Sequence, residues 1–133
     1  MKIQTNFYRL LTHGSLLSAE CFYSWDNRVA MGFTIDARNI ILNHFQDKTW
    51  ALFYDARNWQ VDNHIAESIF SKITRPELSE TLTHIACVTG DKGNESWKNI
   101  GSFKENSHYK VMFFPKKQDA ETWLKAAGYK LTQ

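Results

Sequence analysis

Residues 50–67, WALFYDARNWQVDNHIAE, decide how the rest of the chain is arranged. The stretch opens with an apolar run, Trp50 to Tyr54, that stops at Asp55. A polar segment containing Trp59 follows, and a helix is predicted to start near Asp62. This pattern is typical of a buried parallel strand that ends at the carboxyl edge of an α/β sheet, where such folds bind their ligands. The functional residues are therefore expected in the loop after this strand.

The composition predicts one globular domain spanning residues 1–133. Hydrophobic residues make up 43% and charged residues 23% of the 133 positions, which are ordinary globular values. No Pro- or Gly-rich linker and no internal repeat divides the chain. Aromatic residues make up 14%. Their large rings can thicken a small core, and they can also line a pocket or an interface.

Charge and cysteine usage exclude several classes of partner. The net charge is +2, and the longest basic run is the pair Lys116–Lys117, whereas nucleic-acid binders concentrate positive charge on one face. No apolar run approaches the ~20 residues of a membrane span, and the first thirty residues do not have the order of a signal peptide. Cys21 and Cys87 lie in apolar surroundings and match no metal-ligand spacing. A cytoplasmic protein with buried free thiols is expected, without nucleic acid as a partner.

The first half of the chain predicts a hairpin followed by a helix. Residues 2–11 and 16–25 read as strands joined by a turn at His13–Gly14–Ser15. In the second strand every other position is apolar (Leu17, Ala19, Cys21, Tyr23 and Trp25), which predicts one buried face. The pair Asp26–Asn27 supplies a predicted N-cap for a helix over residues 28–45. One apolar row of this helix is Val29, Phe33, Ala37, Ile40, Ile41 and His44, and an adjacent row is Met31, Ile35, Leu42 and Phe45. Such a wide apolar sector predicts a deeply packed helix.

The second half alternates helices and strands. The helix from Asp62 is predicted to end at Arg75–Pro76, because proline disfavours helical geometry in the residue before it. The remaining predicted elements are a short helix over 77–82, a strand over 83–89, a short helix from Asn94, a strand over 109–114 and a helix over 117–127 with Gly128 as its C-cap. The order β-β-α-β-α-β-α-β-α implies an α/β domain with about four helices, whose mixed, mostly parallel sheet is opened by a β-hairpin.

This order of elements, together with four segments, resembles the SpoIIAA-like branch of the STAS fold, which is named after sulfate transporters and anti-sigma-factor antagonists. The segments are ALFYDARNW (51–59), HIACVTG (84–90), YKVMFF (109–114) and DAETWLKAAGY (119–129). The most specific features are a strand ending in Asp55 with Trp59 shortly after it, and Ala120, Trp123 and Leu124 in the last helix. The resemblance covers roughly residues 2–130.

The resemblance implies a binding role without the family's phosphoswitch. Anti-sigma antagonists carry Asp-Ser at the start of the helix after this strand, and a partner kinase phosphorylates that serine. The matching positions here are Asp62 and Asn63, and Asn63 has no hydroxyl to accept a phosphoryl group. The SpoIIAA-like branch is similar in fold to CRAL-TRIO lipid-binding domains, which implies an apolar or amphipathic ligand bound near a membrane.

The expected binding site consists of Asp55, Asn58, Trp59, Asp62, Asn63 and His64. Acid–base catalysis by Asp55 and Asp62 would require both carboxyl groups to face one substrate, and strand-end and helix-cap roles also explain them. His64 and Glu67 are close enough on one helix to share a metal, but no third ligand has a recognisable spacing. The sequence therefore predicts a non-enzymatic protein with no metal and no cofactor.

Two functions rank above a third, an enzyme built on Asp55, Asp62 and His64. The first is a binding module for a small apolar ligand or lipid, in which Trp59 walls the pocket. In that interpretation Trp59→Ala weakens ligand binding and leaves the fold intact; the alternative role for Trp59 is a lid over the seam between helix and sheet. The second function is a protein-interaction module that binds another protein or forms a homodimer through an aromatic face, without a small ligand.

Overall fold

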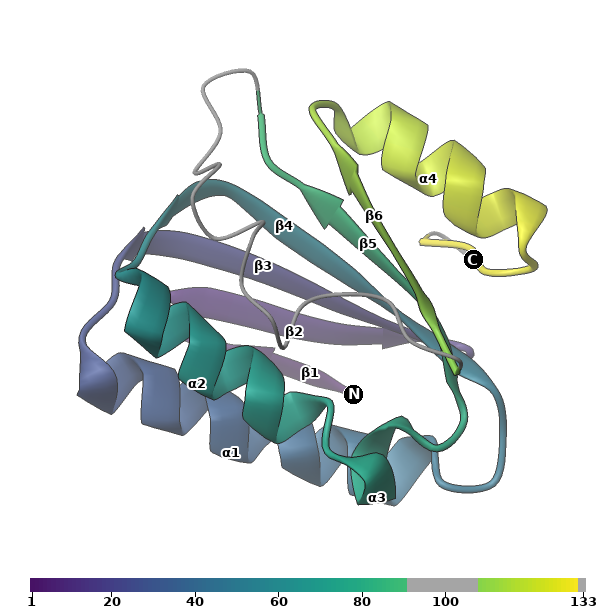
Figure 1. The fold of residues 1–133 in the computed structure, drawn as a ribbon, viewed down its shortest axis with the longest axis horizontal. Coiled ribbons are helices and arrows are strands. Elements are labelled where there is room, and N and C mark those ends of the chain that lie inside the picture. The colour runs from purple at the N-terminus through teal and green to yellow at the C-terminus, as the bar shows by residue number, and fades with distance from the viewer. Residues whose placement is uncertain (91–107, 132–133) are drawn as a thin grey trace.

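The computed structural model describes residues 1–90 and 108–131, which form a six-stranded sheet with four helices (Figure 1). The strands are β1 (Lys2–Gln4), β2 (Tyr8–His13), β3 (Leu16–Ser24), β4 (Trp50–Gln60), β5 (Leu82–Val88) and β6 (Lys110–Phe114), and they lie in this order across the sheet. The pairs β1–β2 and β2–β3 are antiparallel, and the other three pairs are parallel. The predicted α/β class, with a mixed sheet opened by a hairpin, is confirmed.

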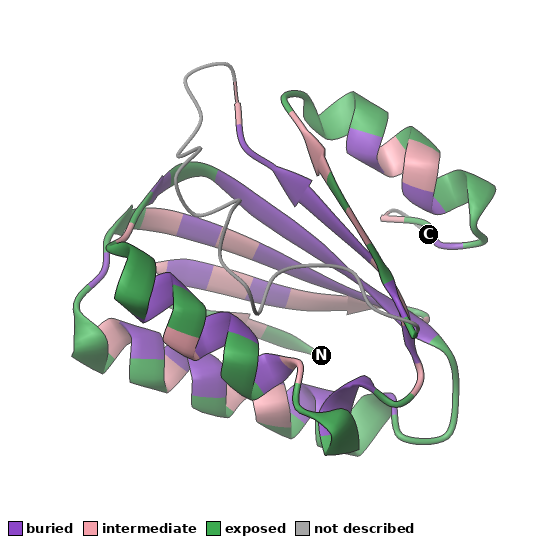
Figure 2. Ribbon diagram, viewed as in Figure 1, coloured by how far each residue is buried: buried purple, intermediate pink, exposed green. Residues whose placement is uncertain are grey.

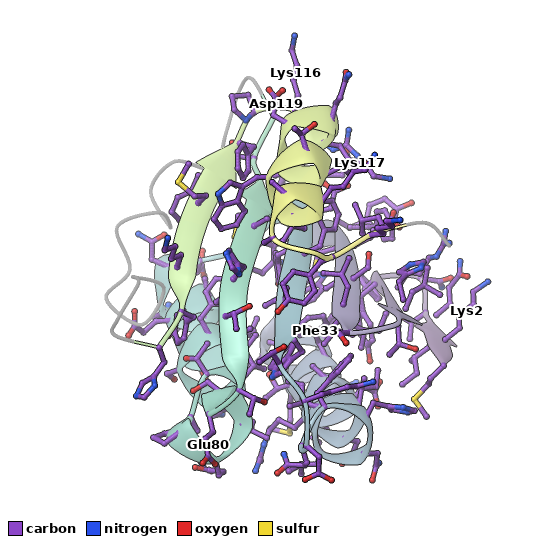
Figure 3. The ribbon with its side chains drawn as sticks, turned by 90° about the vertical axis from the view of Figure 1, so that its right-hand side faces the viewer. Lys2, Phe33, Glu80, Lys116, Lys117 and Asp119 are labelled. Atoms are coloured by element: carbon purple, nitrogen blue, oxygen red, sulfur yellow. The ribbon has the colours of Figure 1, made fainter. Side chains whose placement is uncertain are left out.

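Helices cover both faces of the sheet. They are α1 (Asn27–His44), α2 (Asn63–Ile73), α3 (Pro76–Ser79) and α4 (Lys117–Ala126). Figure 1 shows α1, α2 and α3 on one face and α4 on the other. In Figure 3 the side chains of Lys116 and Lys117 lie at the beginning of α4, where Lys117 Nζ is 3.8 Å from Glu121 Oε1 one turn along the helix. The helix predicted from Asn94, with Trp97, Ile100 and Phe103, lies outside the described residues.

The core has two parts because the sheet is covered on two sides. The larger part lies between the sheet and α1 and α2, and includes most of the buried aromatic rings. The smaller part lies under α4, where Ala120 and Leu124 meet Phe53 and Val88. Figure 2 shows that β4 and β5, the middle strands, are buried over most of their length. Burial on both faces explains why their sequences are nearly continuous apolar runs.

The first predicted strand, over residues 2–11, is divided into β1 and β2. The hydroxyl of Thr5 accepts hydrogen bonds from the backbone N–H groups of Phe7 and Tyr8, at 3.0 and 3.1 Å. The N–H of Thr5 donates to the carbonyl of Tyr8 at 2.9 Å. These local bonds make a turn that reverses the chain, because a threonine hydroxyl can replace the backbone partners that a strand would supply. The turn predicted at Gly14 is confirmed, with φ of 58° at that glycine.

The predicted N-terminus of α1 is confirmed, but its wide apolar sector is not. Asp26 has extended backbone angles and accepts a hydrogen bond from Val29 N. The helix ends at His44, one residue before the predicted end, and the C-cap Phe45 is buried. The second apolar row is the wrong part of the prediction, because Met31, Ile35 and Leu42 are 62%, 52% and 43% exposed. Only the face with Phe33, Ala37, Ile40 and Ile41 packs on the sheet and α2.

The strand expected over residues 50–54 continues as β4 to Gln60, so the prediction of a polar loop after Asp55 is wrong. The reason is a β-bulge: Glu20 pairs with Asp55 and Phe22 with Asn58, so β4 has one extra residue at this point. An extra residue reverses the alternation of side chains between the two faces. Tyr54 and Trp59, five positions apart, therefore both enter the larger core.

The C-terminal helix ends as the sequence predicts. Gly128 has a φ of 98°, a left-handed conformation that favours glycine. Its N–H donates to Lys125 O at 3.0 Å, and the N–H of Tyr129 donates to Leu124 O at 2.9 Å. These two bonds form a Schellman motif. The motif brings the ring of Tyr129 into the smaller core.

The N-termini of α1 and α2 offer a matched test of capping. Both helices have an aspartate at the N-cap, but only Asp26 makes the side-chain hydrogen bond, at 3.0 Å to Val29 N, whereas Asp62 makes none. Asp26→Ala is expected to lower the free energy of unfolding by about 1 kcal/mol. Asp62→Ala is expected to change it by less than about 0.5 kcal/mol. Urea unfolding of the two variants measures the difference, and equal losses would contradict the assigned caps.

Candidate functional site

The carboxyl edge of the parallel strands holds the candidate site. There β3 and β4 end side by side, and the chain enters α1 and α2, whose first turns lie at the same edge of the sheet (Figure 1). An open hollow of about 450 Å³ lies between the two strand ends. Its lining residues are Ser24, Trp25, Gln60, Val61 and Asp62. We call this the carboxyl-edge hollow.

Hydrogen bonds between the strand ends fix the walls of the carboxyl-edge hollow. Ser24 Oγ donates to Gln60 Oε1 at 3.0 Å, and the N–H of Trp25 donates to the carbonyl of Gln60 at 3.0 Å. The indole N–H of Trp25 donates to Phe22 O at 2.9 Å, which fixes the orientation of its ring. Trp25 and Val61 supply apolar atoms, whereas Ser24, Gln60 and Asp62 supply polar ones. The arrangement can hold a molecule that has both an apolar and a hydrogen-bonding part.

Three of the predicted site residues lie beside this hollow. Asp62 lines it, and Asn63 and His64 follow in the exposed first turn of α2. The carboxylate of Asp62 makes no capping bond, so its oxygens are available as hydrogen-bond acceptors. Its backbone carbonyl accepts from Ile65 N and Ala66 N at 3.1 and 3.0 Å and holds the start of the helix.

The other three predicted residues lie elsewhere. Trp59 is 1% exposed and packs in the larger core, so its ring does not line the hollow. Asn58 is exposed on β4, where it pairs with Phe22. Asp55 is in register with Glu20 and Val88, and Val88 belongs to the core under α4. The bulge separates these residues, and the sequence-predicted set therefore does not form one site.

Asp55 is held by Arg57 in a two-pronged ion pair. Arg57 Nε donates to Asp55 Oδ1 at 3.0 Å and Nη2 donates to Oδ2 at 2.7 Å. The backbone N–H of Arg57 also donates to Oδ1, at 3.2 Å. These hydrogen bonds are the main reason that the pKa of Arg57 is raised. A carboxylate with three hydrogen bonds from its own chain is positioned to stabilise the bulge.

Two arginines flank a pair of neighbouring carboxylates on this face of the sheet. Glu20 lies directly across from Asp55 on the adjacent strand, an arrangement that is unfavourable for like charges. Arg9 pairs with Glu20 from the other side, at 4.0 Å, and Arg57 pairs with Asp55. In the row Arg9–Glu20–Asp55–Arg57 the two positive charges therefore balance the two negative charges. Asp55 has a structural role in this row.

The sequence prediction missed four residues that line the hollow: Ser24, Trp25, Gln60 and Val61. The sequence nevertheless contains a signal for them. Asp-Asn follows each of the two strands, at Asp26–Asn27 and at Asp62–Asn63. Parallel neighbouring strands end at the same edge of a sheet, so the residues just before each Asp-Asn pair must lie together. The register confirms this, with Ser24 opposite Gln60.

Tyr23, the residue before Ser24 on β3, has an unusual backbone conformation. Its φ is 65°, in the left-handed region that bulky residues seldom adopt, and its side chain is 66% exposed. Its ring meets the rings of Phe7 and Phe22, with centroids at 6.2 and 6.4 Å. Strained exposed residues concentrate at functional sites, so this aromatic group strengthens the assignment of the edge.

A second polar cluster lies at the amino end of β5. Thr83 Oγ1 is 2.6 Å from Tyr129 Oη and 2.8 Å from His84 Nδ1. The imidazole of His84 also meets the ring of Trp123, at 5.0 Å between centroids. Burial, and then the charge of Lys110, lower the pKa of His84. These contacts fasten α4 and the segment after it to the sheet, which is a structural role.

The described residues contain no other clear chemical site. In residues 1–90 and 108–131, no group of three or more His, Cys, Asp or Glu side chains could hold a metal ion. No helix in the same ranges is long and apolar enough to cross a membrane. Cys21 and Cys87 are free and buried, as predicted, and burial raises the pKa of both thiols.

The chain was also compared with known proteins. No protein-family model matches it, and no curated protein matches it either.

Proposed function

We propose that this chain is a SpoIIAA-like, STAS-type binding module that accepts a small amphipathic ligand in the carboxyl-edge hollow. The observation that carries the proposal is the hollow itself, at the edge where α/β folds bind their ligands. Its volume of about 450 Å³ falls within the range of small-molecule sites, roughly 300–1,000 Å³. The mixed sheet opened by an antiparallel hairpin supports the family assignment that the sequence segments indicate.

The lining supports an amphipathic ligand over a purely apolar one. Trp25 and Val61 offer a small apolar contact, and Ser24, Gln60 and Asp62 surround it with hydrogen-bonding groups. The carboxylate of Asp62 makes no capping bond, and it favours a ligand head group that donates hydrogen bonds. The protein is proposed to meet this ligand in the cytoplasm, because buried free thiols persist best in a reducing compartment.

Titration of the ¹⁵N-labelled protein with octyl glucoside, below its critical micelle concentration, tests the proposal. This probe joins an octyl chain to a neutral, hydroxyl-rich head group. Saturable shifts are expected at the amides of Trp25, Gln60, Val61 and Asp62, because these residues line the hollow. Native mass spectrometry of freshly purified protein, followed by extraction, would identify a ligand already bound. An absence of saturable shifts at the hollow, with no co-purified small molecule, would overturn the proposal.

A matched pair of amide residues on β4 sharpens this test. Gln60 lines the hollow, whereas Asn58, two positions earlier and also exposed, does not. Gln60→Ala is expected to weaken probe binding about threefold to tenfold, the effect of losing one hydrogen bond. Asn58→Ala is expected to leave the affinity unchanged. If Asn58→Ala weakened probe binding and Gln60→Ala did not, the binding site would instead include the residues predicted from the sequence alone.

A further inference from the structure

A line of exposed apolar side chains runs along α1. Met31, Ile35 and Leu42 are 62%, 52% and 43% exposed, and Arg38 lies between the last two. We call these four residues the α1 stripe. Their spacings of four, three and four residues place them in one row along the helix, as in the seam of a helix pair. Of the six large apolar side chains exposed among the described residues, three belong to this stripe.

We infer that the α1 stripe is the contact by which two copies of this chain pair, with their α1 helices antiparallel across a two-fold axis. The stripe is self-complementary about its midpoint between Asp36 and Ala37. When a second copy is turned end for end, Met31 of each helix faces Leu42 of the other, and Ile35 faces Arg38. A two-fold interface requires this correspondence, in which the same patch serves both partners.

The charges at the two ends of α1 favour the antiparallel arrangement. Arg28 is exposed in the first turn and Asp47 is exposed just after the helix. In the described residues neither side chain forms an ion pair within its own chain. The end-for-end pairing places Arg28 of each copy opposite position 45 of the other, two residues before Asp47, on both sides of the axis. It also sets the two helix dipoles in opposite directions, which is favourable.

Arg38 limits the affinity of this dimer. Its Nε is buried and has no hydrogen-bond partner in the described residues, so the side chain lies along the surface. The aliphatic part of an arginine can cover an apolar neighbour such as Ile35 of the second copy. The two guanidinium groups, however, carry like charges near the axis, and a polar residue in a seam costs stability. The expected species is a weak dimer that dissociates on dilution.

Sedimentation velocity from micromolar to near-millimolar concentration tests the pairing. The unmodified chain is expected to shift from monomer to dimer over this range. Met31→Lys is expected to raise the dissociation constant at least about tenfold, because it buries a charge against Leu42. Met112→Lys is the matched control, because Met112 is 44% exposed but lies on β6. This substitution should leave the dissociation constant unchanged. Arg38→Leu should lower the constant at least about tenfold, by removing the like charges.

Disulfide trapping tests the antiparallel geometry. Both native cysteines are buried, so only introduced thiols react under mild oxidation. The double variant Met31→Cys with Leu42→Cys is expected to form a covalent dimer, because each new thiol faces its counterpart in the other copy. Each single variant should remain monomeric on a denaturing gel, since its two new thiols lie at opposite ends of the interface. Efficient dimers from the single variants would indicate parallel helices and contradict the inference.

Two further results would overturn the pairing. A monomer at every concentration, with no effect of Arg38→Leu, would show that a second copy does not occupy the stripe. Monomers that co-sediment with phosphatidylcholine vesicles, and lose this association in Met31→Lys, would assign the stripe to a lipid surface. Because Met31 is exposed, its replacement should not unfold the domain, and equal urea midpoints for Met31→Lys and the unmodified chain check this.

Discussion

Trp59→Ala is expected to lower the free energy of unfolding by about 3–5 kcal/mol, the cost of truncating a large buried aromatic residue. The indole of Trp59 is 1% exposed and meets the rings of Trp25 and Tyr54, each at 5.3 Å between centroids, and of Phe70 at 6.2 Å. Such edge-to-face pairs contribute about 0.5–1.5 kcal/mol each beyond the area they bury. Urea unfolding followed by far-UV circular dichroism measures the loss.

Two other variants keep this prediction testable if Trp59→Ala is too unstable to fold. Trp59→Phe preserves an aromatic ring and is expected to lose less than half as much stability as Trp59→Ala. Asn58→Ala, at the neighbouring exposed position, should stay within about 0.5 kcal/mol of the unmodified chain. A Trp59→Ala protein with an unchanged urea midpoint would place the indole outside the core, in the loop that the sequence predicted.

The prediction also revises how Trp59 is related to function. The sequence led to the expectation that Trp59→Ala would weaken binding and leave the fold intact. In the structure the ring of Trp59 packs against the ring of Trp25, and Trp25 lines the carboxyl-edge hollow. Any effect of Trp59 on binding would therefore act through the position of Trp25. Binding by Trp59 variants is informative only when their stability has been measured first.

The sequence predicted the elements whose periodicity is regular. The apolar residues at every second position of 16–25 correspond to β3, where Leu17, Ala19 and Cys21 are buried, although Tyr23 of the same row is 66% exposed. The Asp26 cap and Gly128 correspond to the ends of α1 and α4. These features depend on local backbone chemistry, which neighbouring residues determine. The hairpin and the parallel order of the later strands follow from the same local elements, because topology rules restrict how they connect.

The sequence could not predict the bulge in β4, and the candidate site depends on it. The extra residue between Asp55 and Asn58 exists only in relation to the pairing with β3, where Glu20 and Phe22 are the partners. A polar segment with one tryptophan has the same local pattern whether it forms a loop or a bulged strand. The expected binding residues were therefore placed one after another along a loop, whereas the structure distributes them between the core, the α4 face and the hollow.

Exposure along α1 could not be predicted for a similar reason. Ile40 and Ile35 are equally apolar, yet the first is completely buried and the second is 52% exposed. Which of two apolar rows faces the sheet depends on how α1 lies against α2, a tertiary contact with no local signal. Three residues of the second row, Met31, Ile35 and Leu42, belong to the α1 stripe, whereas Phe45 is buried. An error in the sequence interpretation therefore identifies the proposed surface for a second copy.

Arg57→Ala is expected to lower the free energy of unfolding by about 1–3 kcal/mol, because it leaves the Asp55 carboxylate buried without its ion-pair partner. The side chain of Asp55 is 9% exposed and that of Arg57 is 41% exposed. Solvent screens the arginine, so the loss comes mainly from the stranded carboxylate and not from the pair's own attraction. One bond survives in the variant, the 3.2 Å contact from the backbone N–H at position 57 to Asp55 Oδ1.

The double variant Asp55→Ala with Arg57→Ala separates these contributions. Removing both charges leaves no buried carboxylate to compensate, so the combined loss should be smaller than the sum of the two single losses by about 1–2 kcal/mol. Urea unfolding of the four proteins in the cycle gives this coupling energy. If Arg57→Ala alone leaves the free energy of unfolding unchanged and the coupling energy is zero, the Asp55 carboxylate is already solvated. It would then be free to accept a ligand, as the sequence predicted, and the binding site would extend from the hollow across β4 to the α4 face.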